Sequence, residues 1–163
     1  MAEPVCRALG DAIEASLKAL VIPHRRGGTY LCINGPQFSS RAESRLFRSW
    51  GADVIGMTNM PEAKLAREAE LPYATVAMVT DYDSWREGEG AVEVADILEV
   101  MRKNTEAARG MLADLAARLG PTRQRSPLGI ETALDAAIIT PPEARDPALV
   151  EKLGTAAGRA LRR

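Results

Sequence analysis

The chain has 163 residues and almost no net charge, because 21 Lys and Arg residues balance 22 Asp and Glu residues. This balance removes the electrostatic argument for nucleic acid or an anionic membrane as the main partner. The two cysteines, Cys6 and Cys32, indicate neither a disulfide framework nor a zinc site. With no membrane-span-length apolar stretch and no signal peptide, we expect a single cytoplasmic domain over residues 1–163.

The first half of the chain alternates amphipathic helices with short β-rich runs. Ser40 and Glu43 have the spacing of a capping box, which begins a helix ending near Trp50. The predicted order is helix, strand, helix, strand, helix, strand, over residues 5–20, 29–33, 40–50, 53–57, 61–70 and 73–79. The last run is apolar on both faces, as a parallel strand covered by helices requires. The pattern predicts an α/β fold with right-handed crossovers.

The second half is predicted to be helical. Apolar residues at helical spacing trace one long helix from beyond Gly90 to Leu119, and Gly120-Pro121 ends it. Residues 121–163 are expected to form an irregular tail with short helices, the last from about Pro147 towards Leu161.

Some residues allow more than one interpretation. His24 is the only histidine and precedes the first strand, so a Ser-His-Asp hydrolase is not expected. The acidic cluster at 81–89 is open to three interpretations: a solvated turn, a Mg²⁺ or Ca²⁺ site, or proton handling. Its spacing fits no recognised metal loop. Phe38, one of two phenylalanines, either plugs the space between helix and sheet or stacks on a purine.

Three blocks of sequence carry a family resemblance: GPQFSSRAES at 35–44, GADVIGMTNMPEAKLA at 51–66 and ATVAMVTDYDSW at 74–85. Together they resemble the S-methyl-5'-thioadenosine phosphorylases of the trimeric purine nucleoside phosphorylase superfamily, and the resemblance runs from Met1 to about Leu119. It implies a three-layer fold with a mostly parallel or mixed central sheet flanked by helices. It also implies a trimer that cleaves methylthioadenosine with phosphate, in purine and methionine salvage, without metal or organic cofactor.

The resemblance also implies roles for individual residues. Phe38 would stack on adenine with Ser39 near the base, Met57 would lie against the ribose, and Thr58 would hydrogen-bond the phosphate. The base edge would be held by Asp81, Tyr82 and Asp83, with the two aspartates catalytic. The apolar slot for the methylthio group would be formed by Val92, Val94, Ile97 and Leu98.

The expected chemistry centres on Asp81. Cleavage of the glycosidic bond builds negative charge on the leaving purine, so a donor is needed at adenine N7. A neutral Asp81 can donate to N7 with one oxygen and accept from the 6-amino group with the other. Burial and a second carboxylate two residues away favour that neutral form. An asparagine would suit a 6-oxopurine instead, so Asp81 favours adenine.

Met1 to Cys6 resembles a mid-chain segment of the family. We therefore expect the chain to correspond to the carboxyl-terminal part of such a phosphorylase, with Thr58 as its one phosphate contact and without turnover on its own. Two alternatives remain open. In the first, the chain is part of a purine nucleoside phosphorylase with another base preference. In the second, it is a non-catalytic partner that assembles with longer or complementary chains.

Overall fold

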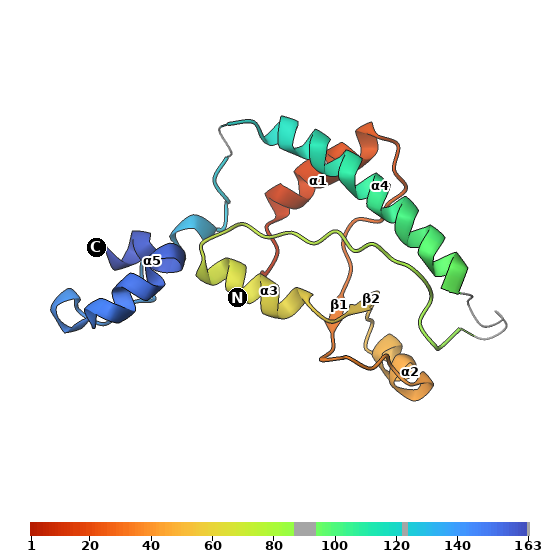
Figure 1. Cartoon of the computed structure of the whole chain (residues 1–163), viewed down its shortest axis with the longest axis horizontal. Helices are drawn as coiled ribbons and strands as arrows, with labels where there is room; N and C mark the ends of the chain where they lie inside the picture. The colour runs from red at the N-terminus through yellow and green to blue at the C-terminus, as the bar shows by residue number, and fades with distance from the viewer. Residues whose placement is uncertain (87–93, 122–123, 163) are drawn as a thin grey trace. The chain divides into compact units, whose positions relative to one another are not determined.

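The computed structural model describes residues 1–86, 94–121 and 124–162. Its elements are α1 (Arg7–Ala19), β1 (Tyr30–Cys32), α2 (Arg41–Ser49), β2 (Val54–Gly56), α3 (Asn59–Glu68), α4 (Val94–Leu119), the 3-10 turns η1 (Ile130–Thr132) and η2 (Pro142–Ala144), and α5 (Pro147–Leu161) (Figure 1). They form two compact units: Met1–Asp11, Met60–Thr75 and Thr122–Arg163 make up the first, and Ala12–Asn59 and Val76–Pro121 the second. In the described ranges, no helix is long and apolar enough to span a membrane.

A two-stranded parallel sheet lies in the second unit. β1 pairs with β2 in the register Tyr30↔Val54, Leu31↔Ile55 and Cys32↔Gly56. The pairing continues past β1, where the Ile33 N–H donates to the Gly56 carbonyl at 2.9 Å. The Tyr30 hydroxyl occupies the space that a side chain at Gly56 would need. The two parallel strands are joined through helix α2, which is the β-α-β unit of an α/β fold. The predicted α/β class is therefore confirmed.

The predicted third strand, Tyr73–Val79, is wrong. The structure has no strand at 72–80. The contacts of its backbone include the hydrogen bond from the Cys6 N–H to the Tyr73 carbonyl (2.7 Å) in the first unit and that from Asn104 Nδ2 to the Val79 carbonyl (3.0 Å) in the second. Met78 and Val79 are 52% and 57% exposed. Apolar composition favours a strand only where a neighbouring strand supplies its hydrogen bonds, and no described segment pairs with this one.

Helices α1, α2 and α3 end in the same hydrogen-bond motif. After each helix, two N–H groups bond back into its last turn, from Val21 to Lys18 and Ile22 to Leu17 in the case of α1. This is the Schellman pattern, whose central residue takes a left-handed conformation that glycine adopts most easily. Gly51 takes that place after α2, at φ +81°, whereas Val21 (φ 55°) and Glu70 (φ 57°) take it after α1 and α3. Both side chains are therefore held in a strained backbone conformation.

In the second unit, the segment from Ala12 to Leu20, which includes most of α1, packs against α4. Ile13, Met111 and Leu115 are buried, and Leu20 Cδ1 lies 3.8 Å from the place that a Cβ would take at Gly110. The apolar stripe of the long helix is thus a packing surface for α1, as its helical spacing predicts.

In the first unit, the tail packs on the segments around Cys6 and α3. Cys6 is buried and its thiol donates to Ser126 Oγ at 3.6 Å, while Ala63, Ile130 and Ala160 are buried nearby in the same unit. Helix α5 spans the range that the sequence predicts for a last helix, Pro147–Leu161.

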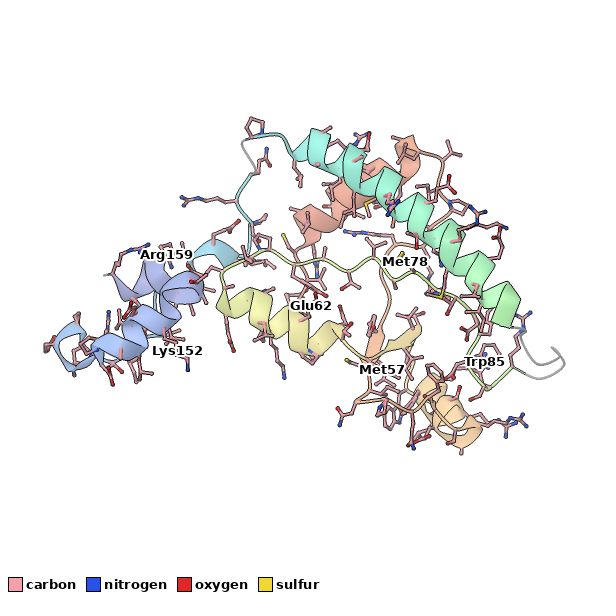
Figure 2. All side chains as sticks on the ribbon, in the orientation of Figure 1. Met57, Glu62, Met78, Trp85, Lys152 and Arg159 are labelled. Carbon is pink, nitrogen blue, oxygen red and sulfur yellow. The ribbon has the colours of Figure 1, made fainter. Side chains whose placement is uncertain are left out.

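Glu70 connects the end of α3 to the tail. Its carboxylate accepts from the Leu134 N–H at 3.0 Å and from Arg159 Nε at 2.6 Å. Arg159, which is labelled in Figure 2, also pairs with Asp135. The Arg159 hydrogen bond holds the pKa of Glu70 below its usual 4.5, and Glu70 in turn raises the pKa of Arg159. This interaction accounts for a non-glycine residue at a position that favours glycine, because glycine would lose the carboxylate.

Val21→Gly is expected to stabilise the chain by about 1 kcal/mol, because it relieves left-handed strain at a largely exposed side chain. Urea denaturation measures the change. Glu70→Gly is the matched contrast, since it gives the same backbone relief but removes the carboxylate that holds Arg159. It is expected to destabilise. Equal stabilisation by both variants would contradict the assigned role of Glu70.

The stability contributed by Glu70 is expected to depend on pH. Its folded-state pKa lies below the unfolded value of about 4.5, so its contribution is present above that value and lost as pH falls through the folded pKa. The rates at which a protease cleaves the tail should therefore differ between wild type and Glu70→Gln at neutral pH. The two rates should become similar at acidic pH. A difference that persists unchanged at pH 3 would contradict the account.

Candidate functional site

The carboxyl ends of β1 and β2 lie at one edge of the sheet, because the strands are parallel. Met57 and Thr58 directly follow β2, and Gly35 lies three residues beyond β1. The Met57 sulfur occupies the space that a Cβ at Gly35 would need, so the two post-strand segments touch (Figure 2). Met57 is half-buried and Thr58 is exposed. This edge is where open α/β folds bind ligands.

A hollow of about 210 Å³ opens beside this edge. It is lined by Ile33, Asn34, Gly35, Gln37, Phe38, Ser39, Glu43 and Phe47. Two of the residues assigned to the base, the sequence neighbours Phe38 and Ser39, line this hollow. The hollow is smaller than the roughly 300–1,000 Å³ of typical ligand pockets, so it accounts for only part of a nucleoside.

Phe38 does not plug a core. It is 89% exposed, so the interpretation in which it fills the space between helix and sheet is wrong. Phe38 lies in the turn before α2, two residues before Ser40, which is the N-cap of that helix.

The capping box predicted for Ser40 and Glu43 is confirmed. Glu43 Oε2 accepts from the Ser40 N–H at 2.7 Å, and the Glu43 N–H donates to Ser40 Oγ at 3.3 Å. The Ser40 hydroxyl, followed by the Ser40 N–H, holds the pKa of Glu43 below its usual value. The hollow therefore has an ionised carboxylate in its lining, able to accept a hydrogen bond from an amino group.

The aspartates lie in an irregular segment, residues 80–86. Asp81 is exposed and its Oδ2 accepts from the Thr80 hydroxyl at 2.6 Å, while Tyr82 is 61% exposed. The burial expected for Asp81 is therefore not provided by the described part of the chain. Asp83 is half-buried, and its Oδ1 accepts from the Ser84 N–H at 2.8 Å.

Asp83 lines a second, smaller hollow of about 60 Å³. The residues around it are Ser44, Phe47, Arg48, Ala52, Asp53, Val54, Ile55, Asp83 and Trp85. Phe47 lines both hollows, so its ring lies between the surroundings of Asp83 and those of Phe38. Asp81 lines neither of the two.

Residues 80–86 are attached to the segment that carries Phe38. Ser84 Oγ donates to the Ser39 carbonyl at 3.1 Å, and Arg41 Nε donates to the Ser84 carbonyl at 3.3 Å. Segments 45 residues apart in sequence are thus held side by side. The predicted gathering of the Phe38 and Asp83 segments is present.

The proposed methylthio slot is not assembled in the described residues. Ile97 is half-buried and Leu98 is 59% exposed on α4, and neither lines the hollow beside Phe38. Val92 and the side chain of Val94 lie outside the described residues. The described ranges also contain no group of three or more His, Cys, Asp or Glu arranged to hold a metal ion, and Glu87 and Glu89 lie outside them.

Comparison with known proteins identifies the family. The sequence model of the phosphorylase superfamily matches residues 1–117. The chain belongs to the phosphorylase superfamily. It is 53% identical to an S-methyl-5'-thioadenosine phosphorylase of Rhodospirillum rubrum, over 99% of this chain and 55% of that protein.

Solved structures of the superfamily agree. A methylthioadenosine phosphorylase from an Antarctic soil metagenomic library superposes with a TM-score of 0.86 at 40% identity, over 96% of this chain and 55% of that one. A Schistosoma mansoni methylthioadenosine phosphorylase in complex with adenine gives 0.69 at 33% identity, over 82% of this chain and 51% of that one. These matches confirm the nucleoside phosphorylase fold. The chain spans about half the length of the curated relatives it matches.

Sequence reasoning missed the residues that attach segment 80–86 to α2. They are Arg41, Arg48, Ser84 and Trp85. Two signals were available: Trp85, one of two tryptophans, lies two residues after Asp83, and the two arginines are seven positions apart, which places them on one face of a helix. Neither signal identifies a partner without the fold.

Gly35→Ala is expected to destabilise this phosphorylase-superfamily chain more than Gly51→Ala does. Both glycines have positive φ, so alanine costs about 1–2 kcal/mol of backbone strain at each, but only at Gly35 does the new Cβ meet Met57. Chemical denaturation measures both changes. In a Met57→Ala background, Gly35→Ala should no longer destabilise the chain more than Gly51→Ala does. A difference that persists would show that Met57 does not touch this turn.

Proposed function

We propose that this chain forms the base- and ribose-binding part of an enzyme that cleaves methylthioadenosine with phosphate. The products are adenine and 5-methylthioribose 1-phosphate. One observation carries the proposal: the hollow beside Phe38 and Ser39 lies at the carboxyl edge of the sheet in a chain that is 53% identical to a methylthioadenosine phosphorylase. In the living cell the complete enzyme works as a trimer in the cytoplasm.

Phe38 supplies the stacking surface for adenine. Phe38 is 89% exposed, so the apolar face of its ring is in contact with water. A purine stacked on that face removes it, and the facing side of the purine, from solvent. Ser39 lies beside the ring in the same hollow and approaches the edge of the base.

Asp81, Tyr82 and Asp83 hold the edge of the base. The hydrogen bonds between Ser84, Ser39 and Arg41 keep their segment next to Phe38. Asp81 is exposed in the chain, so a bound base has access to its carboxyl group. The acid then donates to N7 as the glycosidic bond breaks, and the purine leaves as a stabilised ring.

The sugar and phosphate bind beside the base. Met57, which contacts Gly35, packs against the ribose, and the exposed Thr58 hydroxyl bonds the phosphate. The slot for the methylthio group is assigned to Ile97 and Leu98 of α4, together with Val92 and Val94. A single hydroxyl binds a phosphate dianion only weakly, because such an anion is ordinarily bound by several charge-assisted donors. The 163-residue chain is therefore proposed to bind the base and to lack turnover by itself.

Adenine binding by the isolated chain tests this proposal. Equilibrium dialysis should detect adenine binding and weaker hypoxanthine binding. Asp81→Asn should weaken adenine binding about tenfold, the loss of one good hydrogen bond, and leave hypoxanthine unchanged or improved. Glu151→Gln, an exposed carboxylate-to-amide change on α5, is the control.

Two results would refute specific parts of the proposal. A preference for hypoxanthine in the unmodified chain would favour a purine nucleoside phosphorylase of another base specificity. Robust adenine release from methylthioadenosine and phosphate by this chain alone would contradict the inferred lack of turnover.

A further inference from the structure

Two arginines flank a pair of aromatic rings in residues 82–86. The Arg48 guanidinium lies 3.7 Å from the centroid of the Trp85 ring, and the Arg86 guanidinium lies 3.9 Å from that of Tyr82. The two rings meet edge to face, with centroids 6.0 Å apart and planes at 86°. Trp85 is half-buried against α2, so this is an ordered contact between two elements (Figure 2).

Helix α2 holds the same segment at two levels of one face. Arg41 and Arg48 are two helical turns apart, and Arg41 binds the Ser84 carbonyl while Arg48 covers Trp85. Ser84 completes the attachment through its hydrogen bond to the Ser39 carbonyl. We name Arg41, Arg48, Ser84 and Trp85 the clasp.

The position of Arg41 is informative. It stands in the first turn of α2, where the helix dipole disfavours a cation. Glutamate or aspartate would stabilise the helix better there. The contact with Ser84 accounts for an arginine at this place.

Two residues of the clasp, Arg48 and Trp85, lie beside Asp83. This residue lies between Tyr82 and Ser84, lines the same small hollow as Arg48 and Trp85, and its carbonyl accepts from the Arg86 N–H at 3.2 Å to close a turn. Residues 81–86 have no helix or strand to fix them, so the clasp sets where Asp83 stands relative to Phe38.

We propose that Arg48 and Trp85 are positioning residues of the base site, which act by holding Asp83 and its neighbours at the correct distance from Phe38. The proposal rests on the proposed function, since it assigns these residues to the same adenine site. An exposed arginine–aromatic contact contributes about 0.5–1 kcal/mol, which suits local ordering of a short segment better than stability of the fold.

Fluorescence and adenine binding together test the clasp. In a Trp50→Phe parent, Trp85 is the one tryptophan left, so its emission reports the contact directly. Arg48→Met should raise acrylamide quenching of Trp85 and weaken adenine binding about three- to fivefold, while the urea midpoint changes little. Arg48→Lys should retain part of the protection of Trp85 from quenching and part of the affinity for adenine. Arg109→Met, at an exposed arginine on α4, is the matched control and should change neither.

The outcomes separate the two proposals. Adenine binding that Arg48→Met leaves unchanged would overturn the clasp and leave the proposed function standing. Absence of adenine binding in the parent would overturn the proposed function, and with it the role of the clasp. Unchanged quenching in Arg48→Met would show that the stack is not formed, and would also overturn the inference.

Discussion

The parallel pairing of β1 with β2 is the constraint on which the site depends. Parallel strands end at the same edge, so the residues after Cys32 and after Gly56 must meet. The pairing extends to Ile33, and the Met57 sulfur then packs on Gly35, where a side chain would collide with it. A one-residue shift in register would separate Met57 from Gly35 and would send the turn that carries Phe38 in another direction.

A second constraint comes from outside the sheet. Residues 80–86 have no regular structure, and they are held by groups on α2 and on the turn before it. The same helix therefore fixes Phe38 through its N-cap and the aspartate segment through its two arginines. Phe38 and the acidic groups are therefore positioned by one rigid element, which is what a preorganised binding site requires.

Much of this arrangement could be predicted from sequence, because it depends on local patterns. Helical spacing predicted α1 and α4, Ser40 and Glu43 predicted the start of α2, and Asn34-Gly35-Pro36 predicted the end of β1. Tyr73–Val79 was predicted wrongly, because a strand requires a partner that composition does not show. The exposure of Phe38 and Asp81 and the stack on Trp85 depend on contacts between distant segments. The left-handed conformation of Glu70, at a position that favours glycine, could not be predicted for a similar reason, since its partner Arg159 is 89 residues away.

A crystal structure of the chain soaked with adenine would test the central claim most directly. The account predicts a purine stacked on Phe38 in the hollow at the carboxyl edge of β1 and β2, with its N7 and 6-amino edge facing residues 81–83. Adenine bound elsewhere on the chain, with the Phe38 ring still bare to solvent, would contradict it.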